Sequence, residues 1–145
     1  MQRIEEHLDS TDLNPATALN AAYNRAEYVV DFVKLAREKD ATGFAKLMAE
    51  QCDLDKADAQ QIIDDKKGFA FAVCLKSLAL PSYVANEAFI LLNPKLGTDV
   101  EQVFLLDWFY GLISPATARS LTKTWSKDKT NRSYQSVYAL SLIHI

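Results

Sequence analysis

Apolar residues recur along most of this chain at the three- and four-residue spacing of an α-helix. The first strong pattern predicts a long helix over residues 15–39. Asn14 is a good N-cap, and Pro15 suits the first helical position because its missing N–H has no partner to lose there. The apolar stripe of this helix consists of Leu19, Ala22, Ala26, Val29, Val30, Val33 and Ala36. We expect a short helix over residues 2–9 to precede it.

The rest of the chain divides into three similar units, at residues 43–64, 68–92 and 101–125. In each unit an apolar helix ends at an aliphatic residue, a short polar or proline joint follows, and a second helix begins. The aligned aliphatic residues are Leu54, Leu80 and Ile113. Alanine follows five positions later in every unit, at Ala59, Ala85 and Ala118. The pattern indicates a degenerate helical repeat in which small side chains let two helices approach closely.

The residues at the three joints favour a helix break. Asp55 is suited to cap the helix that follows it. Ser114 is a cap residue directly before Pro115, which suits the first helical position. Pro81 disfavours helix at the residue before it, and Ser82 offers a cap for the next helix.

These patterns predict an all-α fold, with consecutive antiparallel helix pairs forming a short solenoid-like or bundle array. We expect one domain over residues 1–128. Residues 129–145 read as a polar, frayed tail. The last five residues, SLIHI, look like the peptide that sequencing-adapter read-through encodes, so no function is assigned to His144.

Composition agrees with a helical globular protein. The chain is 49% hydrophobic and 24% charged, and its four glycines and four prolines are too few for the many turns of an all-β fold. No apolar stretch approaches the length of a membrane span, and the charged N-terminus lacks the apolar core of a signal peptide. We therefore expect a cytoplasmic protein that does not contact membranes, with Cys52 and Cys74 as buried free thiols.

The central part of the chain resembles a known bacterial family. Three features carry the resemblance: the unit ending Leu-Asp before a second helix, the joint Asp-Asp-Lys-Lys-Gly, and Leu-Ala-Leu-Pro before the next helix, all within residues 40–115. They look like the C-terminal part of the family named domain of unknown function 2336, whose members are mainly alphaproteobacterial helical proteins. The resemblance implies a helical, cytoplasmic bacterial protein, and it implies no activity and no catalytic residue.

Charge is distributed unevenly. Residues 1–111 hold 11 basic and 18 acidic side chains, whereas residues 112–145 hold 5 basic and 1 acidic side chain. Arg119, Lys123 and Lys127 are spaced to share one helical face. This face is either a solvated surface or a contact for an anionic partner, and nucleic acid is disfavoured because the chain is acidic overall.

No constellation of residues predicts catalysis. The only histidines, His7 and His144, lie at opposite ends of the sequence, so no metal site, cofactor or histidine-based acid–base pair is expected. Neither cysteine has a histidine or a cationic helix start nearby in the sequence, as a nucleophile would require. Asp64 and Asp65 are adjacent, which points their carboxylates in different directions.

The strongest candidate for function is the segment over residues 100–113, which is apolar nearly all round as a helix. Such a helix either lies centrally in a core or contributes to an interface. For the second alternative the expected anchors are Trp108, Phe109, Tyr110 and Trp125. We predict a non-enzymatic helical scaffold that binds a protein partner or its own copy. The alternative is a small-molecule-sensing or enzymatic domain with a pocket between helix pairs.

Overall fold

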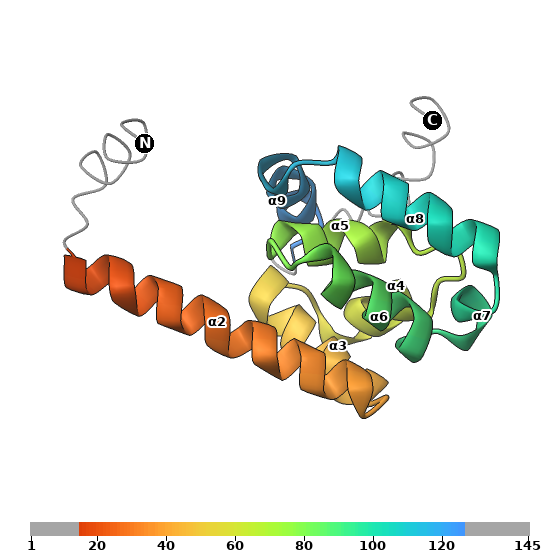
Figure 1. The fold of residues 1–145 in the computed structure, drawn as a ribbon, viewed down its shortest axis with the longest axis horizontal. Helices are drawn as coiled ribbons and strands as arrows, with labels where there is room; N and C mark the ends of the chain where they lie inside the picture. The colour runs from red at the N-terminus through yellow and green to blue at the C-terminus, as the bar shows by residue number, and fades with distance from the viewer. Residues whose placement is uncertain (1–14, 127–145) are drawn as a thin grey trace. The chain divides into compact units, whose positions relative to one another are not determined.

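The computed structural model describes residues 15–126, apart from the side chains of residues 17–26. This part of the chain is all-helical, which confirms the predicted fold class (Figure 1). Its eight helices are α2 (Pro15–Arg37), α3 (Ala41–Cys52), α4 (Lys56–Asp64), α5 (Phe69–Ser77), α6 (Ser82–Leu92), α7 (Pro94–Gly97), α8 (Val100–Leu112) and α9 (Pro115–Thr124). None of these helices combines the length and the hydropathy needed to cross a bilayer. The expected helix over residues 2–9, Asn14 and the tail lie outside the described residues.

The chain divides into two units at a point inside α2, between Asp31 and Phe32. The sequence predicted a single domain over residues 1–128. The first unit contributes the N-terminal part of α2, on which Val30 is exposed. The second unit begins with the last turns of α2 and contains every other described helix. In this unit Phe32 and Ala36 are fully buried, and Arg37 forms an ion pair with Glu87 at 2.9 Å.

The three predicted joints are confirmed as helix boundaries. Asp55, Pro81 and Ser114 are the N-cap residues of α4, α6 and α9. The Ser114 hydroxyl accepts a hydrogen bond from the backbone N–H of Thr117 at 3.1 Å, as a capping serine should. At the second joint the cap is Pro81 rather than Ser82, because the extended backbone of Pro81 already turns the chain into the helix.

Helix α7 was not predicted, because it is only one turn long and has no apolar periodicity of its own. Its start is nevertheless readable: Asn93 caps it by accepting from the N–H of Leu96, and Pro94 occupies its first position. The buried Asn93 side chain also donates to the carbonyl oxygens of Ile63 and Asp65 at 3.0 and 2.9 Å. One side chain therefore joins the end of α4 to the start of α7.

Helix α5 is the centre of the second unit. Every residue of α5 except Lys76 is buried. It contacts α3, α4, α6, α8 and α9, and its most extensive contact is with α9 (Figure 1). A helix without an exposed face needs neighbours on all sides, and here five helices supply them.

An aromatic chain runs through this core. The rings of Phe32 and Phe44 lie 4.9 Å apart, those of Phe44 and Phe71 lie 5.8 Å apart, and those of Phe71 and Phe89 lie 5.5 Å apart. The aligned alanines of the three units are all fully buried, as their small size at close helix contacts predicts: Ala59, Ala85 and Ala118.

Two glycines provide a test of the packing. Gly68 has φ +79°, and a Cβ added there would lie 2.6 Å from Cδ1 of the buried Leu106. We expect Gly68→Ala to lower the free energy of unfolding by about 1–2 kcal/mol, because L-residues are strained in this backbone region. Gly111 is the matched control. A Cβ there meets nothing within 4 Å, so Gly111→Ala should raise stability by about 0.5–1 kcal/mol. Urea denaturation measures both, and shifts of equal sign would contradict the prediction.

Candidate functional site

Helix α8 carries an exposed apolar face. Phe104 and Trp108 are 70% and 46% exposed, and Val100 and Leu112 are also exposed, at a spacing of four residues along the helix. Residues four apart share one side of a helix, so these four side chains form a stripe. We call Val100, Phe104, Trp108 and Leu112 the α8 face.

The opposite side of α8 holds it in place. Leu106 is fully buried, and the Phe109 ring packs edge-on against Phe69 at 5.1 Å. The Tyr110 hydroxyl donates to the carbonyl oxygen of Leu80 at 2.6 Å, and the Lys76 ammonium lies 4.5 Å from the centre of the Tyr110 ring. Burial raises the pKa of Tyr110 well above its usual range. These contacts leave the stripe pointing away from the core.

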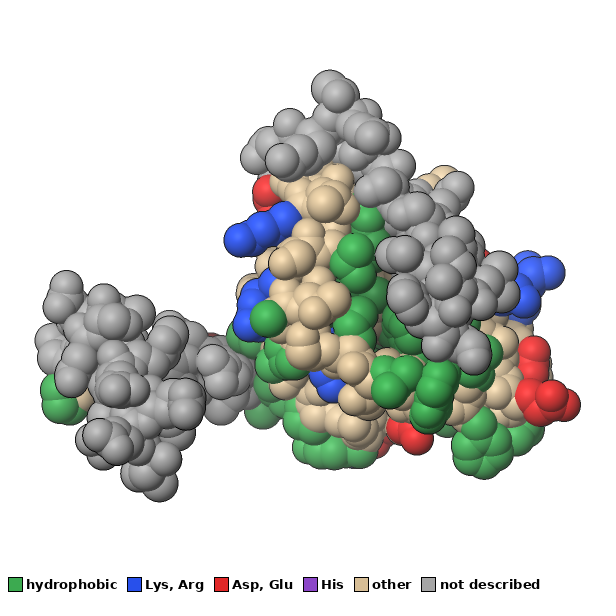
Figure 2. Space-filling model, turned by 90° about the horizontal axis from the view of Figure 1, so that it is seen from above, with side chains coloured by type: hydrophobic (Ala, Val, Ile, Leu, Met, Phe, Trp, Pro, Cys, Tyr) green, Lys and Arg blue, Asp and Glu red, His purple; other side chains and the backbone are tan. Residues whose placement is uncertain are grey.

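The charged side chains that α8 and its cap contribute are acidic. Asp99, which caps α8, and Glu101 and Asp107 are all exposed, and α8 contains no lysine or arginine. Asp107 accepts a hydrogen bond from the side-chain amide of Asn86 on α6 at 3.0 Å. Figure 2 shows hydrophobic side chains at the surface of the described part of the molecule, with charged side chains around them.

The predicted contact residues separate into two groups. Trp108 lies on the α8 face, and Phe109 is half-buried beside it. Tyr110 and Trp125 are each 1% exposed, which corrects the expectation that they anchor a partner. Tyr110 is turned toward Leu80, and Trp125 is buried at the end of α9. Phe104 was missed as an anchor, although its spacing of four from Trp108 was a readable signal.

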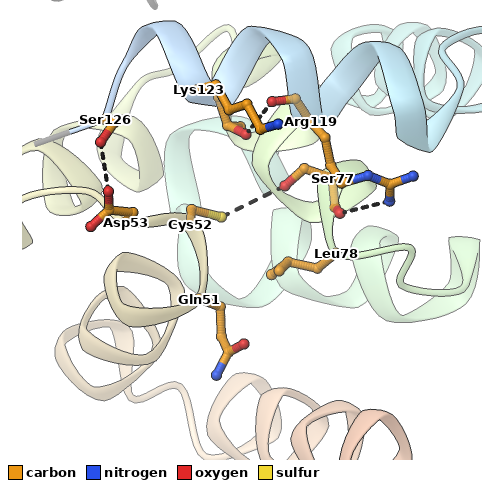
Figure 3. Close-up of a pocket in the computed structure, with 9 residues that line it drawn as sticks. Gln51, Cys52, Asp53, Ser77, Leu78, Arg119, Lys123 and Ser126 are labelled. Carbon is orange, nitrogen blue, oxygen red and sulfur yellow. Dashed lines mark hydrogen bonds between the residues drawn. The ribbon is translucent and has the colours of Figure 1, made fainter. Parts of the chain in front are cut away.

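A second candidate site is a pocket of about 530 Å³ lined by α3, α5, α9 and the residues that directly follow them (Figure 3). Cys52 enters from the last turn of α3, Ser77 from the last turn of α5, and Arg119 and Lys123 from α9. The alternative function expected from the sequence needs such a pocket between helix pairs.

The pocket brings together two of the three predicted anionic-partner contacts, Arg119 and Lys123, whereas Lys127 lies outside the described residues. Arg119 donates to the carbonyl oxygen of Ser77 at 3.5 Å, which holds part of its guanidinium against the end of α5. The pocket also contains the carboxylate of Asp53, which accepts from the Ser126 hydroxyl at 2.6 Å (Figure 3).

The free thiol of Cys52 lies beside the backbone of Cys74 at this pocket, a proximity that the sequence did not reveal. Cys52 lines the pocket, its Sγ lying 3.8 Å from the carbonyl oxygen of Cys74 and 3.7 Å from the Ser77 hydroxyl. The Cys52 thiol donates to the Cys74 carbonyl oxygen, and its interaction with the Cys74 side chain lowers the pKa of Cys52. The same interaction, together with complete burial, raises the pKa of Cys74 well above its usual range.

Within residues 15–126, no group of three or more histidine, cysteine, aspartate or glutamate side chains comes together in a way that could hold a metal ion. His7 and His144 lie outside this range. Comparison with protein-family models, with curated proteins and with solved structures finds no match to this chain. The resemblance to domain of unknown function 2336 therefore stays a prediction.

Proposed function

We propose that this chain is a non-enzymatic protein-interaction module whose α8 face binds an amphipathic helical segment of a partner protein. The observation that carries the proposal is the exposure of Phe104 and Trp108 on one side of a helix whose other side is anchored in the core. Aromatic side chains at a spacing of four are typical anchors where one helix packs against another.

The charges around the α8 face favour a partner over a second copy of this chain. The charged side chains of α8 and its cap are all carboxylates, at Asp99, Glu101 and Asp107. Packing two α8 faces together would bring like charges close, which opposes association. A partner segment with lysine or arginine beside its apolar stripe would instead pair with these carboxylates.

The test uses the full chain and two synthetic helical peptides that carry leucines on one side. In one peptide the other side carries lysines, and in the second it carries glutamates. We expect the leucine–lysine peptide to bind and the leucine–glutamate peptide not to bind. Phe104→Ser should weaken binding at least about tenfold, because an aromatic anchor contributes about 2 kcal/mol. Isothermal titration calorimetry measures both affinities.

Tyr83→Ser is the matched control variant. Tyr83 is 61% exposed, like the residues of the α8 face, but it belongs to α6. It lies close enough to Arg37 to raise the pKa of Arg37. We therefore expect Tyr83→Ser to leave peptide binding unchanged. Equal binding of the two peptides, or equal weakening by Phe104→Ser and Tyr83→Ser, would contradict the proposal. Light scattering over a dilution series tests whether a second copy of this chain occupies the α8 face. A dimer that Phe104→Ser dissociates would assign the α8 face to self-association instead.

A further inference from the structure

We propose that Cys52 and Cys74 form a thiol–disulfide exchange site, and that its oxidant is a small anionic disulfide bound in the pocket between α3, α5 and α9. The two cysteines are 22 positions apart in the sequence, but their helices are in contact, and the Cys52 sulfur lies 3.8 Å from the Cys74 carbonyl oxygen. This site is independent of the α8 face.

The positions of the two thiols assign them different roles. Cys52 lines the pocket and is 9% exposed, so a small molecule in the pocket can reach its sulfur. Cys74 is fully buried behind it on α5. The neighbouring Cys74 side chain lowers the pKa of Cys52, which favours the thiolate, the nucleophilic form of cysteine. Cys52 is therefore the attacking thiol, and Cys74 is the resolving thiol.

The charge of the pocket selects an anionic disulfide. Two cationic side chains, Arg119 and Lys123, and one carboxylate, Asp53, line the pocket, so its formal charge is positive. Asp53 already accepts a hydrogen bond from Ser126, and Arg119 is held against Ser77, while Lys123 is exposed beside them (Figure 3). A positive cleft raises the local concentration of an anionic reactant and its rate of encounter.

The exchange balances without any further reactant. The Cys52 thiolate attacks one sulfur of the disulfide R–S–S–R, the S–S bond breaks, and R–S⁻ leaves with the electron pair and takes up a proton. The Cys74 sulfur then attacks the Cys52 sulfur, the bond from Cys52 to the bound R–S group breaks, and the Cys74 proton passes to this second R–S⁻, which leaves as a thiol as the Cys52–Cys74 disulfide forms. Two electrons pass from the protein to the small disulfide, which leaves as two thiols.

The test incubates the reduced full chain with glutathione disulfide, which is anionic, and follows the masses of acid-quenched samples over time. The wild-type chain should lose the mass of two hydrogens as its internal disulfide forms. Cys74→Ser should stop at a mixed disulfide with glutathione, and Cys52→Ser should not react. Lys123→Glu should slow the reaction roughly tenfold, because it reverses the sign of the pocket's charge.

The neutral reagent 2-hydroxyethyl disulfide is the control, and its rate should not change in Lys123→Glu. Lys123 is exposed, so this variant tests the pocket without disturbing the core. Three results would overturn the proposal: Cys52→Ser reacting as fast as wild type, Lys123→Glu leaving the glutathione rate unchanged, or the folded chain staying reduced while the urea-unfolded chain reacts.

Discussion

Phe71→Ala should lower the free energy of unfolding by about 3–5 kcal/mol, the range observed for truncating a buried aromatic side chain. Phe71 is fully buried on α5, and its ring contacts Phe44 and Phe89 edge-on. Replacing it with alanine leaves a cavity at the middle of the aromatic chain, and helices on several sides would have to move together to close it. Urea denaturation followed by circular dichroism measures the loss.

Trp108→Ala is the matched control for this prediction. Trp108 is larger than phenylalanine but 46% exposed on α8, so its truncation should cost less than about 1 kcal/mol. Phe71→Leu should keep most of the stability, because it retains much of the lost volume. If Phe71→Ala and Trp108→Ala shift the urea midpoint equally, α5 is not the centre of the core.

Asn93→Ala is expected to lower the free energy of unfolding by about 2–4 kcal/mol, although it removes only a few atoms. The Asn93 side chain is 3% exposed and makes three hydrogen bonds, two as donor to Ile63 and Asp65 and one as acceptor from Leu96. Its removal leaves polar backbone groups without these partners, and a buried polar group without a partner costs about 1–3 kcal/mol. The change also deletes the cap of α7.

Asn86→Ala makes the same deletion at a half-buried position on α6. The Asn86 amide donates to the exposed Asp107 carboxylate, which water can solvate in its place, so the loss should be below about 1 kcal/mol. Asn93→Asp keeps the acceptor for Leu96 but removes the amide donor, so it should remain clearly destabilising. An Asn93→Ala loss no larger than that of Asn86→Ala would show that the link between α4 and α7 contributes little.

Helix boundaries were the most predictable part of this protein. Asp55, Pro81 and Ser114 mark helix starts because turn-forming residues and the restricted backbone of proline act within a few residues. Ser114 makes the predicted capping hydrogen bond, whereas the Asp55 side chain, which was also expected to cap, makes none to α4. The buried alanines at positions 59, 85 and 118 followed from the alignment of the same joints. The one-turn helix α7 was missed because a single turn leaves no periodic signal.

The candidate sites were less predictable, and the reason lies in long-range packing. Trp108 and Tyr110 are two positions apart on an equally apolar helix, yet one is exposed and the other is hydrogen-bonded to Leu80 in the core. Nothing local distinguishes them, because the apolar pattern of α8 does not favour one side. The neighbours of α8, namely α5, α6 and α7, decide which side is buried.

The sequence alone therefore determined the helix starts at Asp55, Pro81 and Ser114, since those boundaries depend on interactions within one or two turns. Only the tertiary structure decided that α5, and not α8, is the buried centre, and that α9 packs chiefly against α5. That packing also places Cys52, Ser77 and Lys123 around one pocket from three distant segments. Which side chains are buried, and which lie close together, depends on how the helices pack. Helix packing consists of contacts between residues far apart in the chain, which local sequence patterns do not encode.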